Sequence, residues 1–206
     1  AAEYGFDLES VDVEDALREG RRTPPFTGLI IYGGLWETTL LEQIGRLHPT
    51  VLLGGRTHHA PVDSILVDNA HGVELAVGYL VERGHRSLAL LNGPPDTPTS
   101  WEKKAGFERA VSTSPAPVRG TVIDCSSFSR GSAEEATLKL LTHVPDVTAV
   151  IIGDSLFAQP VYNLLAQRGV AVPQDLSVIV FRDDPRLAEV MPPMTAIGFP
   201  ALEIAR

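Results

Sequence analysis

Residues 63–107 constrain the fold of this 206-residue chain more than any other segment. They read as a strand, an amphipathic helix over Asn69–Arg83, a second strand over Ser87–Leu91, a polar loop and a further helix. Apolar strands without alternation, each followed by an amphipathic helix, are typical of parallel strands that helices cover on both faces. The segment therefore predicts a βαβ unit of an α/β domain.

The same alternation of strand and helix continues through the rest of the chain. Two successive sets of these elements indicate two lobes, which we expect to meet near Gly84-His85. The loop Gly93–Pro98 should lie at the carboxyl edge of a parallel sheet, where open α/β sheets bind ligands. Strands are predicted at residues 6–13, 28–32, 50–53, 64–67, 87–91, 121–124, 148–152, 176–181 and 194–197, and helices at 14–20, 35–47, 69–83, 99–111, 133–141 and 156–167.

The composition excludes several classes of protein. With 44% hydrophobic residues the chain can bury a substantial core. No apolar run approaches the roughly 20 residues that cross a bilayer, and the N-terminus has no signal-peptide pattern. The net charge of −9 repels phosphates, so this chain alone is a poor candidate for DNA binding. The single cysteine, Cys125, excludes an intrachain disulfide and fits an inert core position.

Five short motifs stand in a fixed order along the chain. They are Asp68-Asn69 with Gly84-His85-Arg86, Asn92-Gly93-Pro94 with Lys103–Phe107, Thr148–Asp154, Val172–Val178, and Pro192–Thr195. Each motif alone is unspecific, whereas their shared order and spacing are specific. Together they resemble the effector-binding domain of the lactose-repressor/galactose-repressor (LacI/GalR) family of bacterial transcription regulators, over most of the chain.

The resemblance implies a two-lobed, periplasmic-binding-protein-like α/β fold of type I, in which helices sandwich parallel sheets. The N-terminal lobe would comprise residues 1–84 without its first strand and helix, and residues 199–206 would return to it. The C-terminal lobe would comprise residues 85–198, including a crossover strand. A small ligand would bind in the cleft between the lobes.

The resemblance also implies a function. The chain would be the effector-sensing and dimerisation domain of a cytoplasmic transcription repressor, and would bind a small polar effector such as a sugar. It would work as a homodimer, without contact to membranes. Operator DNA would be bound only through a helix-turn-helix domain that is missing from this sequence. The alternative is an exported solute-binding protein of an ABC sugar transporter, which shares the fold.

Three candidate ligand contacts lie in the helix predicted over 99–111. At Lys103 the family usually has an arginine that reaches ligand hydroxyls or carboxylates, and a lysine replaces that planar fork by a point charge. Thr99 matches a hydroxyl-bearing family position, and Trp101 could stack on a ligand. The alternative roles are a solvated lysine on the helix surface, a helix N-cap and a packed tryptophan, respectively.

Three more candidates follow predicted strands. Asp154 could accept hydrogen bonds from ligand hydroxyls, although the family usually has asparagine where this chain has Gly153. The alternative role of Asp154 is a helix N-cap. Arg182 stands where the family commonly has an acidic ligand contact, so we expect Asp183, one residue later, to contact the ligand. Arg182 would add an anion or hydroxyl contact, unless both residues belong to a solvated turn.

Asp68, His71 and Phe128 complete the predicted ligand set. Asp68 and His71 open the helix predicted over 69–83, and an N-cap is the alternative role for Asp68. Phe128 lies near a position where some family members stack an aromatic ring on the ligand, although its spacing to Gly131 departs from the usual pattern.

The sequence offers no metal site and no catalytic constellation. His58-His59, His71 and His85 lack the spacing of metal ligands, so no metal and no cofactor is predicted. There is no nucleophile motif and no glycine-rich phosphate loop. The paired carboxylates Asp183-Asp184 are adjacent in a turn, which does not space them for acid–base catalysis. We therefore predict that the chain is not an enzyme.

Overall fold

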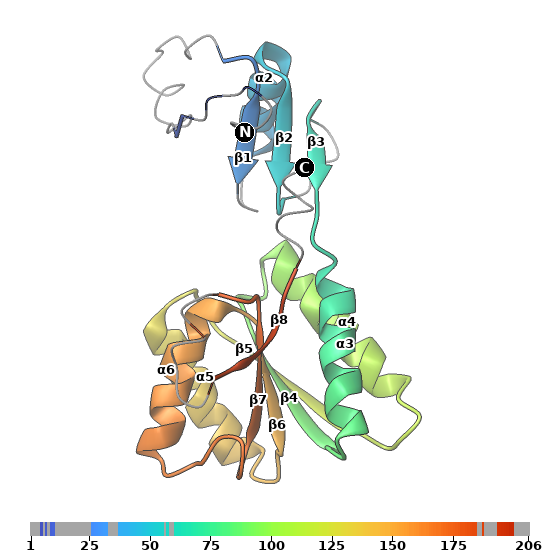
Figure 1. The fold of residues 1–206 in the computed structure, drawn as a ribbon, viewed down its shortest axis with the longest axis vertical. Helices are drawn as coiled ribbons and strands as arrows, with labels where there is room; N and C mark the ends of the chain where they lie inside the picture. The colour runs from blue at the N-terminus through green and yellow to red at the C-terminus, as the bar shows by residue number, and fades with distance from the viewer. Residues whose placement is uncertain are drawn as a thin grey trace. The chain divides into compact units, whose positions relative to one another are not determined.

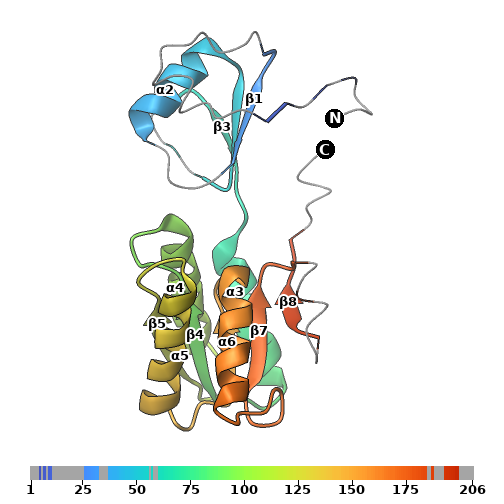
Figure 2. The same cartoon turned by 90° about the vertical axis from the view of Figure 1, so that its left-hand side faces the viewer.

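The computed structural model describes residues 5, 7, 9–10, 26–32, 37–55, 57, 60–184, 187 and 193–199. The chain forms two compact units, Ala1–Leu66 and Val67–Arg206, each of which is visible in Figures 1 and 2. The strand predicted at 6–13, the helix at 14–20 and the segment 200–206 fall almost wholly outside the described residues.

The first unit contains a small parallel sheet with the strand order β1-β2-β3. Helix α2 covers it because Leu41 and Ile44, on one side of that helix, are buried against Ile31 and Leu52 of the sheet. The described elements are β1 (Leu29–Tyr32), α2 (Thr38–Leu47), β2 (Thr50–Leu53) and β3 (Asp63–Ile65).

The second unit is a five-stranded sheet with the order β5-β4-β6-β7-β8. Every pair of neighbouring strands is parallel, including β7 with β8, the strand predicted as the crossover. The elements are α3 (Asn69–Glu82), β4 (Ser87–Asn92), α4 (Pro98–Ser112), β5 (Arg119–Asp124), α5 (Arg130–His143), β6 (Ala149–Ile152), α6 (Ser155–Gln167), β7 (Ser177–Phe181) and β8 (Thr195–Ile197).

The strands of the second unit send alternate side chains into two cores. In β4, Leu88 and Leu90 lie in the core that contains α3 and α4, while Ala89 and Leu91 lie in the core that contains α5 and α6. Figures 1 and 2 show the two helix pairs on opposite faces of the sheet. A strand covered on both faces must be compatible with burial at every position, which is why all of β4 is buried.

Helix α3 belongs to the second unit. The sequence places α3 in a lobe that ends at residue 84, whereas the chain divides after Leu66. The apolar stripe of α3, which includes Val77, shares a core with Phe107 of α4. Gly84 ends α3 with a φ of +90° and turns the chain toward β4. The motif Gly84-His85-Arg86 is therefore a turn from helix to strand within one unit.

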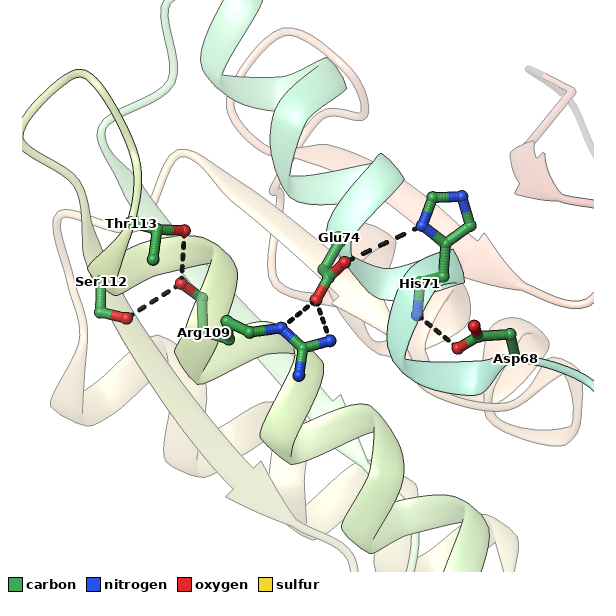
Figure 3. A network of polar contacts seen from close by, with 6 residues as sticks. All are labelled: Asp68, His71, Glu74, Arg109, Ser112 and Thr113. Carbon is green, nitrogen blue, oxygen red and sulfur yellow. Dashed lines mark hydrogen bonds and ion pairs between the residues drawn. The ribbon is translucent and has the colours of Figure 1, made fainter.

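Helices α3 and α4 pack closely because Gly106 has no side chain. A β-carbon at Gly106 would lie 2.5 Å from the carbonyl oxygen of Ala70. On the exposed side, Arg109 of α4 pairs with Glu74 of α3, and Glu74 also approaches Nδ1 of His71 at 3.8 Å (Figure 3). Close backbone packing and an ion pair thus hold the two helices as one layer.

Candidate functional site

Polar groups gather at the carboxyl edge of the sheet in the second unit. Asn92 ends β4, Gly153 follows β6 and Arg182 follows β7. Because these strands are parallel neighbours, their carboxyl ends meet at one edge, and open α/β sheets bind ligands at that edge. Lys103, from the second turn of α4, reaches the same edge.

Lys103 is a buried cation. It is only 6% exposed, and its Nζ donates a hydrogen bond of 2.7 Å to the carbonyl oxygen of Gly153. The same Nζ lies 4.5 Å from the centroid of the Phe181 ring. Lys103 forms no ion pair with any of the residues that the structure describes. The alternative role of a solvated lysine on the helix surface is therefore wrong.

Burial lowers the pKa of the Lys103 ammonium from 10.5 to about 8. The Asp154 carboxylate stabilises the charge, the Arg182 guanidinium destabilises it, and Glu102 adds a weaker stabilising effect. Desolvation outweighs all three, so the surrounding carboxylates do not compensate for the loss of water around the ammonium.

Gly153 is required by the close approach of β6 to β4. A β-carbon at this position would lie 2.9 Å from the carbonyl oxygen of Leu91 and 3.2 Å from Cα of Asn92. The first distance is shorter than contacts of real β-carbons, and its partner is backbone that cannot rotate away. An asparagine, which the resemblance leads us to expect here, would therefore need a shift of this backbone.

Asn92 is a buried polar residue that the sequence analysis named only within a motif. Its Nδ2 donates to the carbonyl oxygen of Ser100 and to Oδ1 of Asp124, both at 3.0 Å. Its Oδ1 is buried and has no hydrogen-bond partner among the described residues. A single amide at the end of an otherwise apolar strand is the sequence signal that could have identified it.

Two predicted site residues are helix N-caps, as their alternative roles required. Oδ1 of Asp154 accepts from the backbone N–H of Leu156 at 3.0 Å at the start of α6. Oδ1 of Asp68 accepts from the N–H of His71 at 2.9 Å at the start of α3, as Figure 3 shows. Among the described residues, no hydrogen bond or ion pair joins Asp68 or His71 to the Lys103 ammonium.

Thr99 is not a helix N-cap, and Trp101 is not a packed core residue. Helix α4 begins at Pro98 with Thr97 as its N-cap residue, so Thr99 is not the cap. The Thr97 hydroxyl donates to the carbonyl oxygen of Pro94 at 2.9 Å and lies 2.6 Å from Oγ of Ser100. Trp101 is 68% exposed and is therefore not a packed core residue. Its indole is open to stacking by a planar group.

The remaining candidates are exposed. Phe128 stacks on Phe157 with ring centroids 5.8 Å apart and still exposes 44% of its surface. Arg182 has a φ of +78°, a left-handed conformation that is uncommon for a residue with a side chain. Its guanidinium lies 5.8 Å from the Phe199 ring centroid. Asp183 is exposed beside it.

A hollow of about 840 Å³ lies at the opposite, amino edge of the same sheet. Its basic side chains are held by the protein itself, since Arg86 donates to the carbonyl oxygens of Val81 and His85, and Arg119 pairs with Asp146. The predicted site residues do not line this hollow. We therefore place the candidate site at the carboxyl edge, around Lys103.

The described part of the chain contains neither a membrane-spanning helix nor a metal-binding cluster. None of its helices combines the length and hydropathy that a membrane crossing requires. No three histidine, cysteine, aspartate or glutamate side chains gather there as a metal ion would need, while His58 and His59 lie outside the described residues. Cys125 is buried, which raises the pKa of its thiol to about 11, as an inert core position predicts.

Comparison with known proteins reveals clear relatives. The periplasmic binding protein-like domain family matches residues 77–206. Catabolite control protein A of Priestia megaterium is 30% identical over 186 residues, which cover 86% of this chain and 56% of that protein. The transcriptional regulator CelR of Thermobifida fusca is 29% identical over 150 residues, which cover 71% and 44%. The chain thus spans about half the length of these curated relatives.

Solved structures agree with these relatives. A LacI transcriptional regulator from a Rhodococcus species superposes with a TM-score of 0.81 at 28% identity, covering 94% of this chain and 69% of that one. The Escherichia coli transcriptional repressor AscG superposes with a TM-score of 0.71 over 93% and 69%. Its identity is 24%, so this second likeness supports the fold alone.

Proposed function

We infer the function of this chain from one premise: it belongs to the periplasmic binding protein-like domain family, as found in LacI-family transcription regulators. We propose that it senses a small polar effector, such as a sugar, at the carboxyl edge of the sheet in its second unit. The relatives are transcription regulators, which favours this function over that of an exported solute-binding protein. These relatives are LacI-family transcription regulators, which are not enzymes.

One observation carries the proposal. The carboxyl ends of β4, β6 and β7 bring together Lys103, Asp154 and Arg182, which are remote in sequence. Trp101, two residues before Lys103 in α4, and Phe128 are also exposed aromatic side chains. Charged groups for orientation and aromatic surface for contact are the combination that binding sites for small polar molecules use.

We further propose that the chain acts as a homodimer in the cytoplasm. Operator DNA would be bound by another part of the protein, because a net charge of −9 opposes contact of this region with phosphates. The effector would act by binding one conformation of the domain more tightly than another. Linkage then requires that operator and effector change each other's affinity by the same factor, typically through about 1–3 kcal/mol of coupling.

A thermal-shift screen tests ligand sensing directly. Neutral sugars, sugar phosphates, nucleosides and small acids would be added to the chain, and a true effector at 100-fold excess over its Kd should add about 2.7 kcal/mol of stability. Each hit would be titrated calorimetrically against Trp101→Ala and Asp183→Asn, which should weaken binding about tenfold or more. Asp146→Asn, at the amino edge, is the control that should bind normally. A hit whose Kd changes only in the control would place its site elsewhere.

A further inference from the structure

Lys103 forms no direct ion pair with the residues that the structure describes, although the Asp154 and Glu102 carboxylates favour its charge from a longer distance. A buried ammonium has three donors, and the only hydrogen bond that Lys103 makes with those residues goes to the neutral carbonyl of Gly153. The Phe181 ring face supplies a second favourable contact, without formal charge. Two donors of a cation that is 6% exposed are thus left without a protein acceptor in the described part of the chain.

In the described part of the chain, the neighbouring carboxylates hydrogen-bond to groups other than Lys103. Asp154 caps α6 through the N–H of Leu156, and Glu102 accepts a hydrogen bond of 2.8 Å from Nδ2 of Asn69. Arg182 brings a second positive charge near Lys103 and acts against its protonation. Buried charges are normally paired, because an unpaired one loses its hydration without compensation. The edge therefore favours the arrival of a negative group from outside the protein.

We propose that the effector of this domain carries an oxyanion, a carboxylate or a phosphate, which pairs with the Lys103 ammonium and lies within reach of Arg182. This inference rests on the proposed ligand-sensing function and specifies the class of its ligand. A neutral sugar would leave the Lys103 ammonium without a directly bonded anion. An oxyanion accepts charge-assisted hydrogen bonds from the donors that Lys103 has left. The site thus selects sugar acids, sugar phosphates or related anions over their neutral counterparts.

Simple anions test the proposal without knowledge of the effector. The melting temperature of the chain would be measured at pH 7 and constant ionic strength, as sodium chloride is replaced by sodium phosphate in one arm and by sodium acetate in the other. Wild type would be compared with Lys103→Met, which fills similar space without charge, and with Lys103→Arg, which keeps the charge. Lys104→Met is the matched control, because Lys104 is the next residue and its side chain is 41% exposed.

The readout is the difference between variants, because phosphate also stabilises folded proteins non-specifically. We expect a saturable extra rise of roughly 2–4 °C in wild type, Lys103→Arg and Lys104→Met, and its loss in Lys103→Met. The arm in which it occurs distinguishes a phosphate from a carboxylate. Equal rises in wild type and Lys103→Met, or no saturable rise in either arm, would overturn the inference.

A paired panel separates this inference from the proposed function. Glucose would be compared with glucose 6-phosphate and gluconate, and ribose with ribose 5-phosphate, in the same melting experiment. Stabilisation by the charged members that disappears in Lys103→Met supports both the inference and ligand sensing. If the neutral members stabilise wild type and Lys103→Met to the same extent as the charged members, the effector is not anionic. Ligand sensing itself would still be supported.

Discussion

The ammonium of Lys103 donates a hydrogen bond of 2.7 Å to the carbonyl oxygen of Gly153, and so ties α4 to the turn between β6 and α6. Helices α4 and α6 cover opposite faces of the sheet. This single side chain therefore connects the two helical layers at the edge where we place the ligand. A ligand that changes the hydrogen bonding of Lys103 acts on both layers at once.

The lowered pKa of Lys103 predicts how stability depends on pH. Its folded pKa of about 8 lies below 10.5, so between these values the unfolded state binds more protons, and stability rises with pH. Relative to Lys103→Met, wild type should gain up to about 1.4 kcal/mol per pH unit in this window. Asp154, Glu102 and Arg182 surround position 103 in both proteins, so the comparison isolates the titration of Lys103. Urea unfolding of both proteins from pH 7 to pH 10 measures the difference, and a constant difference would contradict the lowered pKa.

We expect that α3 and α4 can pack this closely only while residue 106 is a glycine. Gly106→Ala would place a β-carbon against the backbone of Ala70, and should destabilise the chain by about 1–3 kcal/mol. Gly78→Ala is the control, since Gly78 lies inside α3 and a β-carbon added there would meet no atom within 4 Å. That substitution should stabilise the chain by about 0.4–1 kcal/mol. Urea midpoints at constant slope give both values, and equal effects would argue against close helix packing.

Two substitutions of Asp154 should separate its role as the N-cap of α6 from a role in ligand binding. Asp154→Ala removes the cap of α6 and should cost about 0.5–2 kcal/mol, whereas Asp154→Asn keeps a capping oxygen and should remain close to wild type. Urea unfolding measures this difference. If Asp154 also contacts the effector, both variants should bind a thermal-shift hit more weakly by calorimetry. Wild-type affinity in Asp154→Asn would restrict the residue to capping.

Trp101 predicts an optical signal of ligand binding. The chain has two tryptophans, and Trp36→Phe leaves Trp101 as the single emitter. An indole that is 68% exposed emits as in water, so a ligand that stacks on it should shift the emission to shorter wavelength or quench it. Fluorescence titration of Trp36→Phe with a hit measures the effect. An unchanged spectrum at saturation would remove Trp101 from the site.

The succession of strands and helices could be predicted because burial on both faces leaves a direct trace in the sequence. Strands such as β4 and β6 are apolar along most of their length, and Gly84 ends α3 with a left-handed turn that glycine adopts readily. The boundary between the units could not be predicted in the same way. It depends on which sheet α3 packs against, and that choice follows from tertiary contacts with α4.

The site was partly visible in the sequence. Lys103 was predicted as a ligand contact, but its burial was not predicted. Ser100, Lys103 and Phe107 have the spacing of one helix face, and all three are buried. That spacing is the signal that would have separated a buried lysine from a solvated one. The close contact at Gly153 was not predictable, because it depends on the distance between two backbones that are remote in sequence.

The lack of room at Gly153 also limits how this site can change during evolution. A single substitution that introduces an amide side chain there would place its β-carbon 2.9 Å from the carbonyl oxygen of Leu91 and should destabilise the chain. The neighbouring strand would have to shift first. The exposed side chain of Trp101 faces no such barrier. Single substitutions that change ligand preference should therefore be tolerated more readily at Trp101 than at Gly153.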